Sequence, residues 1–290
     1  MSRSEGQLIV ALGDRRYRVE RPWGDIPVGA GMVSDVTVDS RGHVFALLRS
    51  DSLAGPPGTP VLELAPDGRR LASWGEDLIA DGHMLACAPD DRLFIVDRDA
   101  HEVVICSTDG QRIGGLGRRH HPLEPFNHPS DVAIAQDGGI LVSGGYADSR
   151  LHRFDADGSA LGSFGDLGEG PGGFLNPHAV WVMPDGRVVV ADRENDRLQV
   201  FDAAGRPSAI WRGFRQPLDI WGEADGTIFV TDLVPSLHML APDGTRLGRC
   251  RPVLNGAHGI WGGRDGHLYL AEPNPSRLTR LVPLNRQDWR

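Results

Sequence analysis

The sequence predicts an all-β protein folded as a six-bladed β-propeller, and three observations lead to this prediction. Glycine (38 residues) and proline (21 residues) together make up about a fifth of the 290-residue chain, which is typical of a fold with many turns and unlike a helical bundle. A turn dipeptide flanked by short apolar runs recurs six times along the chain. A second turn follows the first in five of the six units.

The first turn series divides the chain into repeating units. Its second residues are separated by 49, 47, 48, 40 and 40 positions. An Asp-Gly dipeptide between β-rich segments, as in VWVMPDGRVVVAD, is typical of a β-hairpin. We therefore expect six hairpins, at Arg41-Gly42, Asp90-Asp91, Asp137-Gly138, Asp185-Gly186, Asp225-Gly226 and Asp265-Gly266.

The second turn series implies about four short strands in each unit. A four-stranded unit of 40 to 50 residues cannot bury both of its faces alone, so six units are expected to stack radially as the blades of a propeller. These second turns lie at Asp67-Gly68, Asp109-Gly110, Asp157-Gly158, Ala204-Gly205 and Asp243-Gly244.

The sixth unit, from about Ala257, lacks a second turn. We expect the N-terminal segment 7–20 to supply its missing outer strand and close the ring. Two separate sandwich domains would need a linker and a break in the period, and neither is visible. The Gly/Pro-rich stretch 165–177 falls where a new unit begins, so it is interpreted as an interblade loop, and residues 1–290 as a single propeller domain.

Composition and charge exclude several classes of partner. The chain has 30 Lys and Arg against 39 Asp and Glu, a net charge of −9, which argues against nucleic-acid binding. No stretch approaches the ~18 apolar residues of a membrane span. The short apolar run Leu8–Leu12 lacks the length of a secretion signal, so we expect a cytoplasmic protein. Three widely spaced cysteines (87, 106 and 250) fit reduced thiols better than a disulfide framework.

A threefold pattern of histidines lies within the sixfold repeat. Eight residues before the second residue of the first turn, blades two, four and six carry His83, His178 and His258. One position later the intervening blades carry acids, Asp35, Asp131 and Asp219. The innermost strands of a propeller line its channel, so three imidazoles are expected around the axis, as a catalytic zinc site requires. The alternative is that each is a channel-lining histidine bonded to a neighbouring carbonyl.

Further candidates follow the second strand of each hairpin, at Leu48-Arg49, Asp97-Arg98, Gly144-Gly145, Asp192-Arg193, Asp232-Leu233 and Glu272-Pro273. An arginine here could anchor a substrate carboxylate through two parallel charge-assisted bonds. Gly144-Gly145 leaves room for Tyr146 to project, and a tyrosine beside a metal can act as a base. The alternatives are an arginine paired with a neighbouring blade's acid and a tyrosine that only packs.

The stretch from Phe126 to Phe201 resembles the lyase domain of peptidylglycine α-amidating enzymes. The similarity rests on PSDVAI, GGYADSR, FLNPHAV and VADRENDRLQVF, which match that family's P-x-D-V-A-V, G-Y-x-N-S-R-I, F-x-x-P-H-S and V-A-D-R-E-N-x-R-I-Q-x-F patterns. A weaker resemblance to NHL-repeat propellers covers nearly the whole chain.

The resemblance implies a specific chemistry and specific residues. The family cleaves peptidyl-α-hydroxyglycine to a peptide amide and glyoxylate at a zinc bound by three histidines. These match His83 in GHML, His178 in NPHAV and His258 in GAHGI, the same three that the repeat selects. The family's catalytic tyrosine matches Tyr146 in GGYADSR, and its two active-site arginines match Arg49 in ALLRSD and Arg193 in ADREND.

Departures from the family pattern point to a changed substrate. A structural calcium ligand of the family is Gly259 here, so a calcium site is doubtful. A methionine near the third histidine is Gly256, Ala147 replaces a disulfide cysteine, and the sequence contains no copper monooxygenase domain. We therefore expect a small α-hydroxy acid, a small-molecule carboxylate substrate, as the compound cleaved.

Several alternatives remain open at the level of sequence. The metal could be Zn²⁺, Fe²⁺ or Mn²⁺, and neither the substrate nor the oligomeric state is specified. A lactonase-like hydrolase on the same propeller would use its metal to activate water, but such relatives usually hold calcium with carboxylates, whereas three imidazoles favour zinc. A non-catalytic interaction propeller of the NHL type is the third possibility.

Overall fold

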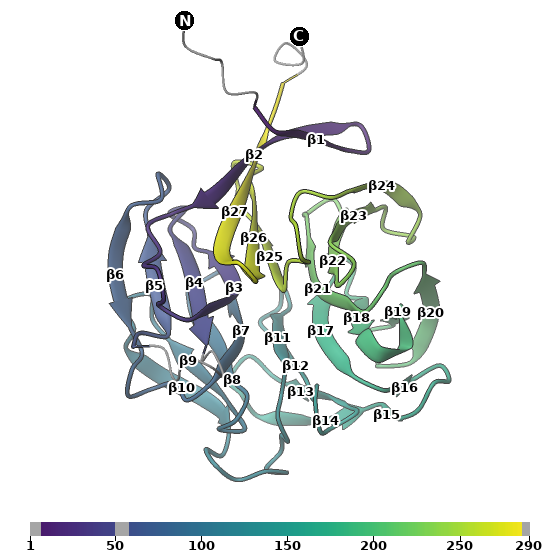
Figure 1. Ribbon diagram of the computed structural model, residues 1–290. Coiled ribbons are helices and arrows are strands. Elements are labelled where there is room, and N and C mark those ends of the chain that lie inside the picture. The colour runs from purple at the N-terminus through teal and green to yellow at the C-terminus, as the bar shows by residue number, and fades with distance from the viewer. Residues whose placement is uncertain (1–6, 50–57, 286–290) are drawn as a thin grey trace, which may run out of the picture.

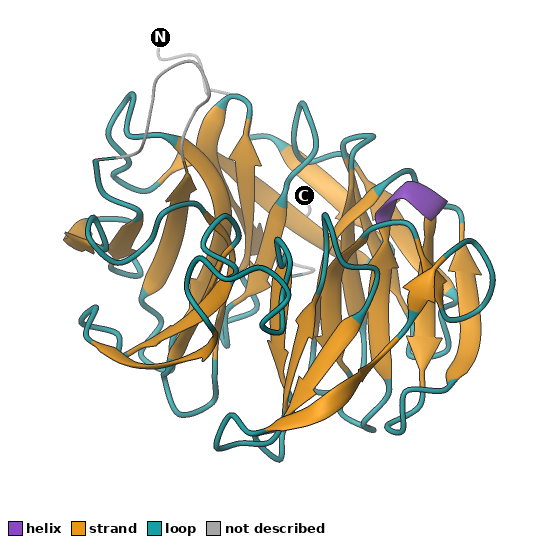
Figure 2. Ribbon diagram, turned by 90° about the horizontal axis from the view of Figure 1, so that it is seen from below, coloured by secondary structure: helices purple, strands orange, loops and turns teal. Residues whose placement is uncertain are grey.

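The computed structural model describes residues 7–49 and 58–285, and in this part of the chain nearly all regular structure is β-strand. Figure 1 shows the strands arranged as blades around a common centre, and Figure 2 shows one short 3-10 helix, η1 (Arg193–Asn195), among them. No helix in the described ranges is long and apolar enough to cross a bilayer. The prediction of an all-β, six-bladed propeller is confirmed.

Blades one to five are four-stranded antiparallel sheets formed by consecutive strands. From the innermost strand outwards, blade one contains β3 (Met32–Val38), β4 (Val44–Arg49), β5 (Val61–Leu64) and β6 (Arg70–Trp74), and blade two contains β7 (Gly82–Cys87), β8 (Leu93–Asp97), β9 (Glu102–Cys106) and β10 (Arg112–Gly117). Blade three contains β11 (Asp131–Ile134), β12 (Ile140–Ser143), β13 (Leu151–Phe154) and β14 (Ala160–Phe164), and blade four contains β17 (Pro177–Val182), β18 (Val188–Asp192), β19 (Arg197–Phe201) and β20 (Pro207–Arg212). Blade five contains β21 (Pro217–Gly222), β22 (Ile228–Asp232), β23 (Ser236–Leu240) and β24 (Arg246–Cys250).

The sixth blade joins the two ends of the described chain. Its sheet contains β25 (Gly259–Gly262), β26 (Leu268–Pro273), β27 (Ser276–Pro283), β2 (Arg15–Trp23) and β1 (Ile9–Leu12). Strand β2 pairs antiparallel with β27, with Val19 opposite Leu281. The N-terminal segment therefore supplies the outer strand as predicted, and β1 adds one more.

The turns explain the glycine content. In five of the six first turns the second residue is a glycine with a φ between 79° and 87°, the left-handed region that glycine enters without a steric cost. Asp91 takes the same role in blade two with a φ of 66°. The predicted interblade loop at 165–177 contains a two-stranded parallel piece, β15 (Asp166–Leu167) with β16 (Gly173–Phe174), and ends at the start of β17.

The core is divided among the joints between blades. Six clusters of buried apolar side chains occur, one between each pair of adjacent blades. Phe45 and Leu47 of blade one, for example, pack with Ile95 of blade two. At the closing joint, Trp23 lies against Tyr269 with ring centroids 5.0 Å apart. Since each blade shares its apolar faces with both neighbours, the ring holds the innermost strands at fixed positions around the channel.

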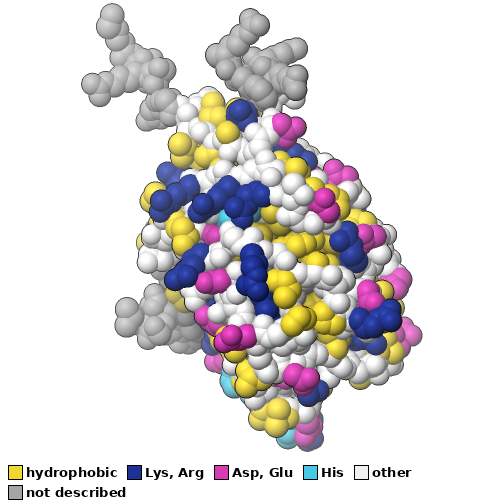
Figure 3. Space-filling view, turned by 90° about the vertical axis from the view of Figure 1, so that its right-hand side faces the viewer, with side chains coloured by type: hydrophobic (Ala, Val, Ile, Leu, Met, Phe, Trp, Pro, Cys, Tyr) yellow, Lys and Arg dark blue, Asp and Glu magenta, His cyan; other side chains and the backbone are white. Residues whose placement is uncertain are grey.

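The outer side of the propeller carries charges of both signs. In Figure 3, which views blades four and five from the side, Arg side chains are interspersed with Asp and Glu and with apolar groups.

Candidate metal centre and active site

Three histidines converge at the end of the channel where strands β7, β17 and β25 begin. His83 and His178 are the second residues of β7 and β17 and are fully buried, and His258 directly precedes β25. Their ring centroids form a nearly equilateral triangle with sides of 5.0, 4.8 and 5.0 Å. One nitrogen of each ring lies within 4.8 Å of the other two. Convergence of the three predicted ligands is therefore a property of the fold.

The hydrogen bonds of these histidines determine which nitrogen is free. Each Nδ1 lies 2.6 to 2.9 Å from a backbone carbonyl oxygen of the next blade: that of Ser130 for His83, Leu218 for His178 and Ser34 for His258. Since a carbonyl only accepts, each Nδ1 carries the proton and donates it, and each Nε2 keeps its lone pair. The alternative expected from sequence, a histidine bonded to a carbonyl, is thus realised at Nδ1 and orients Nε2 as a ligand.

The three imidazoles are held in the neutral form that a metal ligand needs. Burial lowers the pKa of His83 and His178 well below the usual value, and the neighbouring histidines lower it further. Burial, together with the charge of Arg49, lowers the pKa of His258 to about 3. Three neutral nitrogens within 4.8 Å suit a divalent transition metal such as zinc, with a further coordination position left open.

Tyr146 reaches this centre from a loop between strands β12 and β13. Gly145 permits the approach, because its φ is 60° and a Cβ there would lie 2.5 Å from the Cβ of Ser130. The hydroxyl of Tyr146 lies 2.9 Å from Nε2 of His83 and 3.3 Å from Nε2 of His178. A proton-transfer group is therefore beside the position that the three ligands surround.

The two predicted arginines both lie near the histidines, and their charges help to lower the pKa of His178 and His258. Arg193, the first residue of η1, donates from Nη1 to the Tyr146 hydroxyl at 3.4 Å and pairs with the half-exposed Glu194. Arg49, at the end of β4, forms an ion pair at 2.7 Å with Asp81 of blade two. The pairing that was the alternative for a blade-edge arginine thus occurs at Arg49, while Arg193 contacts the tyrosine directly.

Three further residues belong to the site: Asp81 and Asn176, which the sequence did not single out, and Arg98, which it gave only as one of the positions at the strand ends. Asp81 forms ion pairs with both Arg98 and Arg49, each at 2.7 Å, and Cζ of Arg98 lies 5.2 Å from the centroid of the Tyr146 ring. Asn176, with its amide oriented to satisfy its partners, accepts from Nη2 of Arg193 at 3.1 Å and donates to the carbonyl of Gly145. Arg98 stands at the repeat position of Arg49 and Arg193, which is the signal that could have found it.

A second threefold layer lies next to the histidines, formed by the predicted acids. Each carboxylate accepts the backbone amide of the next blade at 2.6 to 2.8 Å: Asp35 from Leu85, Asp131 from Val180 and Asp219 from Ile260. The histidines join blades two to three, four to five and six to one, and the acids join the other three pairs. Each joint of the ring is therefore bridged at the channel by one side chain of these two layers.

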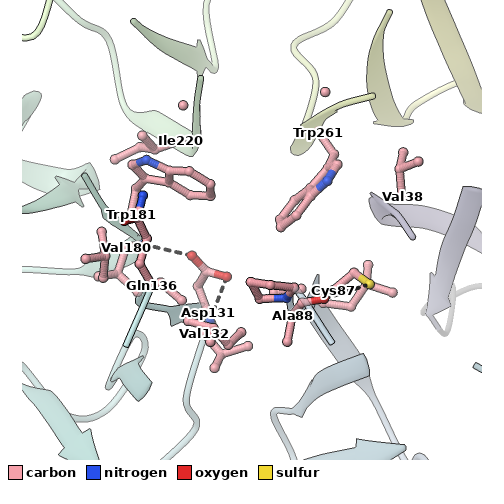
Figure 4. A pocket seen from close by; sticks show the side chains of 18 of the residues that line it. Val38, Cys87, Ala88, Asp131, Val132, Gln136, Val180, Trp181, Ile220 and Trp261 are labelled. Atoms are coloured by element: carbon pink, nitrogen blue, oxygen red, sulfur yellow. Dashed lines mark hydrogen bonds between the residues drawn. The ribbon is translucent and has the colours of Figure 1, made fainter. Parts of the chain in front are cut away.

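The acid layer borders a separate cavity of about 420 Å³ that extends toward the first turns of the blades. Figure 4 shows Asp131 in this cavity, bonded to the amides of Val132 and Val180, with the indole rings of Trp181 and Trp261 nearby. Burial raises the pKa of Asp131 to about 7. Burial and the charges of Asp35 and Asp131 also raise the pKa of Asp219.

The calcium site of the resembled family does not fit these residues. A Cβ at Gly259 would lie 1.9 Å from Oδ1 of Asp35, so the carboxyl of Asp35 fills the space that an acid at position 259 would need. Asp131 and Asp219 each use both oxygens for backbone amides. Among the described residues, the histidines alone form a group of three metal-ligating side chains at this spacing.

Fold and site together define a six-bladed β-propeller with a three-histidine centre at one end of its channel. The NHL repeat pattern matches residues 174–201. The mouse NHL repeat-containing protein 3 is 30% identical over 251 residues, covering 81% of this chain and 67% of the relative. The chain belongs to the NHL-repeat family of propellers.

Two other similarities bear on chemistry and fold. A probable peptidyl-alpha-hydroxyglycine alpha-amidating lyase of Caenorhabditis elegans is 29% identical over 196 residues, which cover 60% of this chain. The match spans about half (56%) of the worm protein's length. Among solved structures, a gluconolactonase from Xanthomonas campestris superposes with a TM-score of 0.70 at 17% identity, covering 94% of this chain and 91% of that one, which supports the fold alone.

Proposed function

We propose that the protein is a metal-dependent lyase that cleaves a carbon–nitrogen or related bond at the hydroxyl-bearing carbon of a small α-hydroxy acid. The observation that carries the proposal is the position of the Tyr146 hydroxyl, within hydrogen-bond distance of two histidine Nε2 atoms and of Arg193. Similarity to amidating lyases supports the same reaction type.

The histidines His83, His178 and His258 would hold the metal. When bound there, a divalent metal supplies Lewis acidity that polarises an oxygen of the substrate. Because Nδ1 of each imidazole is anchored to a carbonyl of the next blade, the ligands are oriented before the metal arrives. The amide of Asn176 connects Arg193 to the carbonyl of Gly145, in the loop of Tyr146, and so fixes the position of the arginine relative to the base.

Tyr146 acts as the base in this proposal. It removes the proton of the substrate hydroxyl, the O–H electrons become the second bond of a new carbonyl group, and the carbon–nitrogen bond breaks toward nitrogen. The departing nitrogen takes up one proton, so the net reaction converts R–NH–CH(OH)–COO⁻ into R–NH₂ and glyoxylate. Arg193 and Arg49 orient the α-carboxylate through charge-assisted hydrogen bonds.

A lactonase-like hydrolase is the competing function, and one experiment separates the two. The purified protein is analysed for metal, reconstituted with zinc, iron or manganese, and assayed for glyoxylate release from N-acyl-α-hydroxyglycines and for hydrolysis of sugar lactones. We expect one metal ion per chain and glyoxylate release. Lactone hydrolysis without glyoxylate release would contradict the proposed lyase function and support the hydrolase function.

A further inference from the structure

Three arginines, not two, occupy the same place in the repeat around the candidate site. Arg49, Arg98 and Arg193 each stand directly at the end of the second strand of their blade, in blades one, two and four. The proposed reaction uses Arg49 and Arg193 to hold one carboxylate. Arg98 has no role in it.

The contacts of Arg98 place it within the same arc of side chains. Its Nη2 lies 2.7 Å from Oδ2 of Asp81, the carboxylate that also pairs with Arg49. Its Cζ lies 5.2 Å from the centroid of the Tyr146 ring, and that of Arg193 lies 5.4 Å from the same centroid. An unbroken chain of contacts therefore runs from Arg49 through Asp81, Arg98 and Tyr146 to Arg193.

Among the residues that the structure describes, the charges in the buried part of this arc do not balance. Arg49 and Arg98 share one carboxylate, that of Asp81, whose side chain is 10% exposed. The other acids that pair with the arginines, Asp99 and Glu194, are 53% and 37% exposed, so water screens their charges more strongly. A metal in the histidine cluster would add further positive charge. A substrate with a single carboxylate leaves this excess largely uncompensated.

We propose that Arg98 binds a second anionic group of the substrate, so that the preferred substrates are α-hydroxy acids whose leaving group carries another carboxylate. This inference rests on the proposed function and names the substrate class for it. The α-carboxylate lies at Arg193 and Arg49, and the second carboxylate exchanges for part of the contact between Arg98 and Asp81. A guanidinium is suited to this exchange because it has five N–H donors, enough for two carboxylates at once.

Catalysis with a matched pair of substrates tests the inference. N-succinyl-α-hydroxyglycine and N-butyryl-α-hydroxyglycine have similar length, and only the first has the second carboxylate. We expect the zinc-loaded wild-type protein to show a kcat/KM at least about tenfold higher for the succinyl compound, mainly through KM, as one charge-assisted hydrogen bond provides. Arg98→Gln should bring the ratio of the two values close to one, and Arg98→Lys should recover part of it.

A control and a rival explanation are built into the comparison. Arg92→Gln removes an exposed arginine that pairs with Asp90 on the first turn of the same blade, and its ratio should equal that of the wild type. If Arg98 only held Asp81 and Arg49 in place, Arg98→Gln would lower kcat/KM for both compounds by the same factor and keep the ratio. That result, or a wild-type ratio near one, overturns the inference while the lyase function stands.

Binding without turnover provides a test that does not depend on the reaction. Malate and 2-hydroxybutyrate are α-hydroxy acids of the same chain length, and only malate has two carboxylates. Calorimetry on the zinc-loaded protein should give at least about tenfold tighter binding of malate, and Arg98→Gln should abolish the difference. Equal affinities in the wild type would overturn the inference even if no lyase substrate had been found.

Discussion

The histidine layer and the acid layer lie one residue apart in the repeat, but their side chains use their polar atoms differently. Both are threefold, both are buried, and both bridge neighbouring blades at the channel. A histidine uses Nδ1 for its bridge and leaves Nε2 without a backbone partner, so that Nε2 of His83 and His178 can contact the Tyr146 hydroxyl. Asp131 and Asp219 use both carboxylate oxygens for backbone amides. A histidine can therefore bridge two blades and hold a ligand at the same time, whereas these two carboxylates serve the fold.

The largest effect should come from removing a histidine. His178→Ala deletes a ligand and the bond to the carbonyl of Leu218, so we expect the metal content and the lyase activity to fall to the level of the metal-free protein. Elemental analysis and the glyoxylate assay measure both. The exposed His120 serves as control, and His120→Asn should keep its metal. Full metal occupancy in His178→Ala would mean that the layer is structural, like the acids.

Tyr146→Phe should have the next largest effect, and it separates catalysis at the histidine layer from metal binding there. The phenyl ring keeps the packing against His83, but the proton acceptor is lost, so kcat should fall by about 10²- to 10⁴-fold. Metal content and melting temperature should stay at wild-type values. Steady-state kinetics with the metal content measured on the same samples decides the point, and near-normal turnover would leave water activated at the metal as the better mechanism.

The sequence was sufficient for the parts of the molecule that repeat. The histidine and aspartate columns follow from counting back from the hairpin turns, because the register of each blade places equivalent residues at the same height in the channel. The closure of blade six by the N-terminal strand was predicted from the one unit that lacks a second turn. Tyr146, by contrast, has no equivalent in the other blades: the Gly144-Gly145 break made it a candidate, and the resemblance to a family motif assigned its role.

The remaining parts of the site depend on contacts between blades that no periodicity encodes. Asp81 precedes β7 and becomes relevant only because blade one brings Arg49 against it. Asn176 matters through an amide that joins Arg193 to Gly145. The clash between an acid at position 259 and Asp35 is likewise visible only in three dimensions, although Gly259 had already made calcium doubtful.

The smallest effect concerns the acid layer and is one of pH. The pKa of Asp131 is about 7 in the folded chain against 3.8 for an ordinary aspartate, so folding binds a proton between these values. Its contribution to stability is fully present below pH 3.8 and is lost as the pH rises through about 7. The free energy of unfolding of the metal-free wild type should therefore increase, relative to that of Asp131→Asn, as the pH falls from 8 to 5.

Urea denaturation of both metal-free proteins across this range measures the difference. At pH 5 Asp131→Asn should be less stable by about 1–3 kcal/mol, because an amide cannot accept from both Val132 and Val180. At pH 8 the gap should narrow, since the ionised wild-type carboxylate is then the costly form. A gap that is independent of pH would mean that Asp131 stays ionised in the fold.

The strand that closes the ring has a consequence for biosynthesis. Strand β2 is synthesised before blades one to five, whereas its partner β27 follows them, so β2 can pair only after all five of these blades have been translated. The carbonyl of Ser34 likewise gains its hydrogen bond from His258 only after blade six has been translated. Because His258 belongs to blade six, a chain halted before that blade lacks one of the three histidines, and any metal that they hold can be bound by all three only after the last blade has been made.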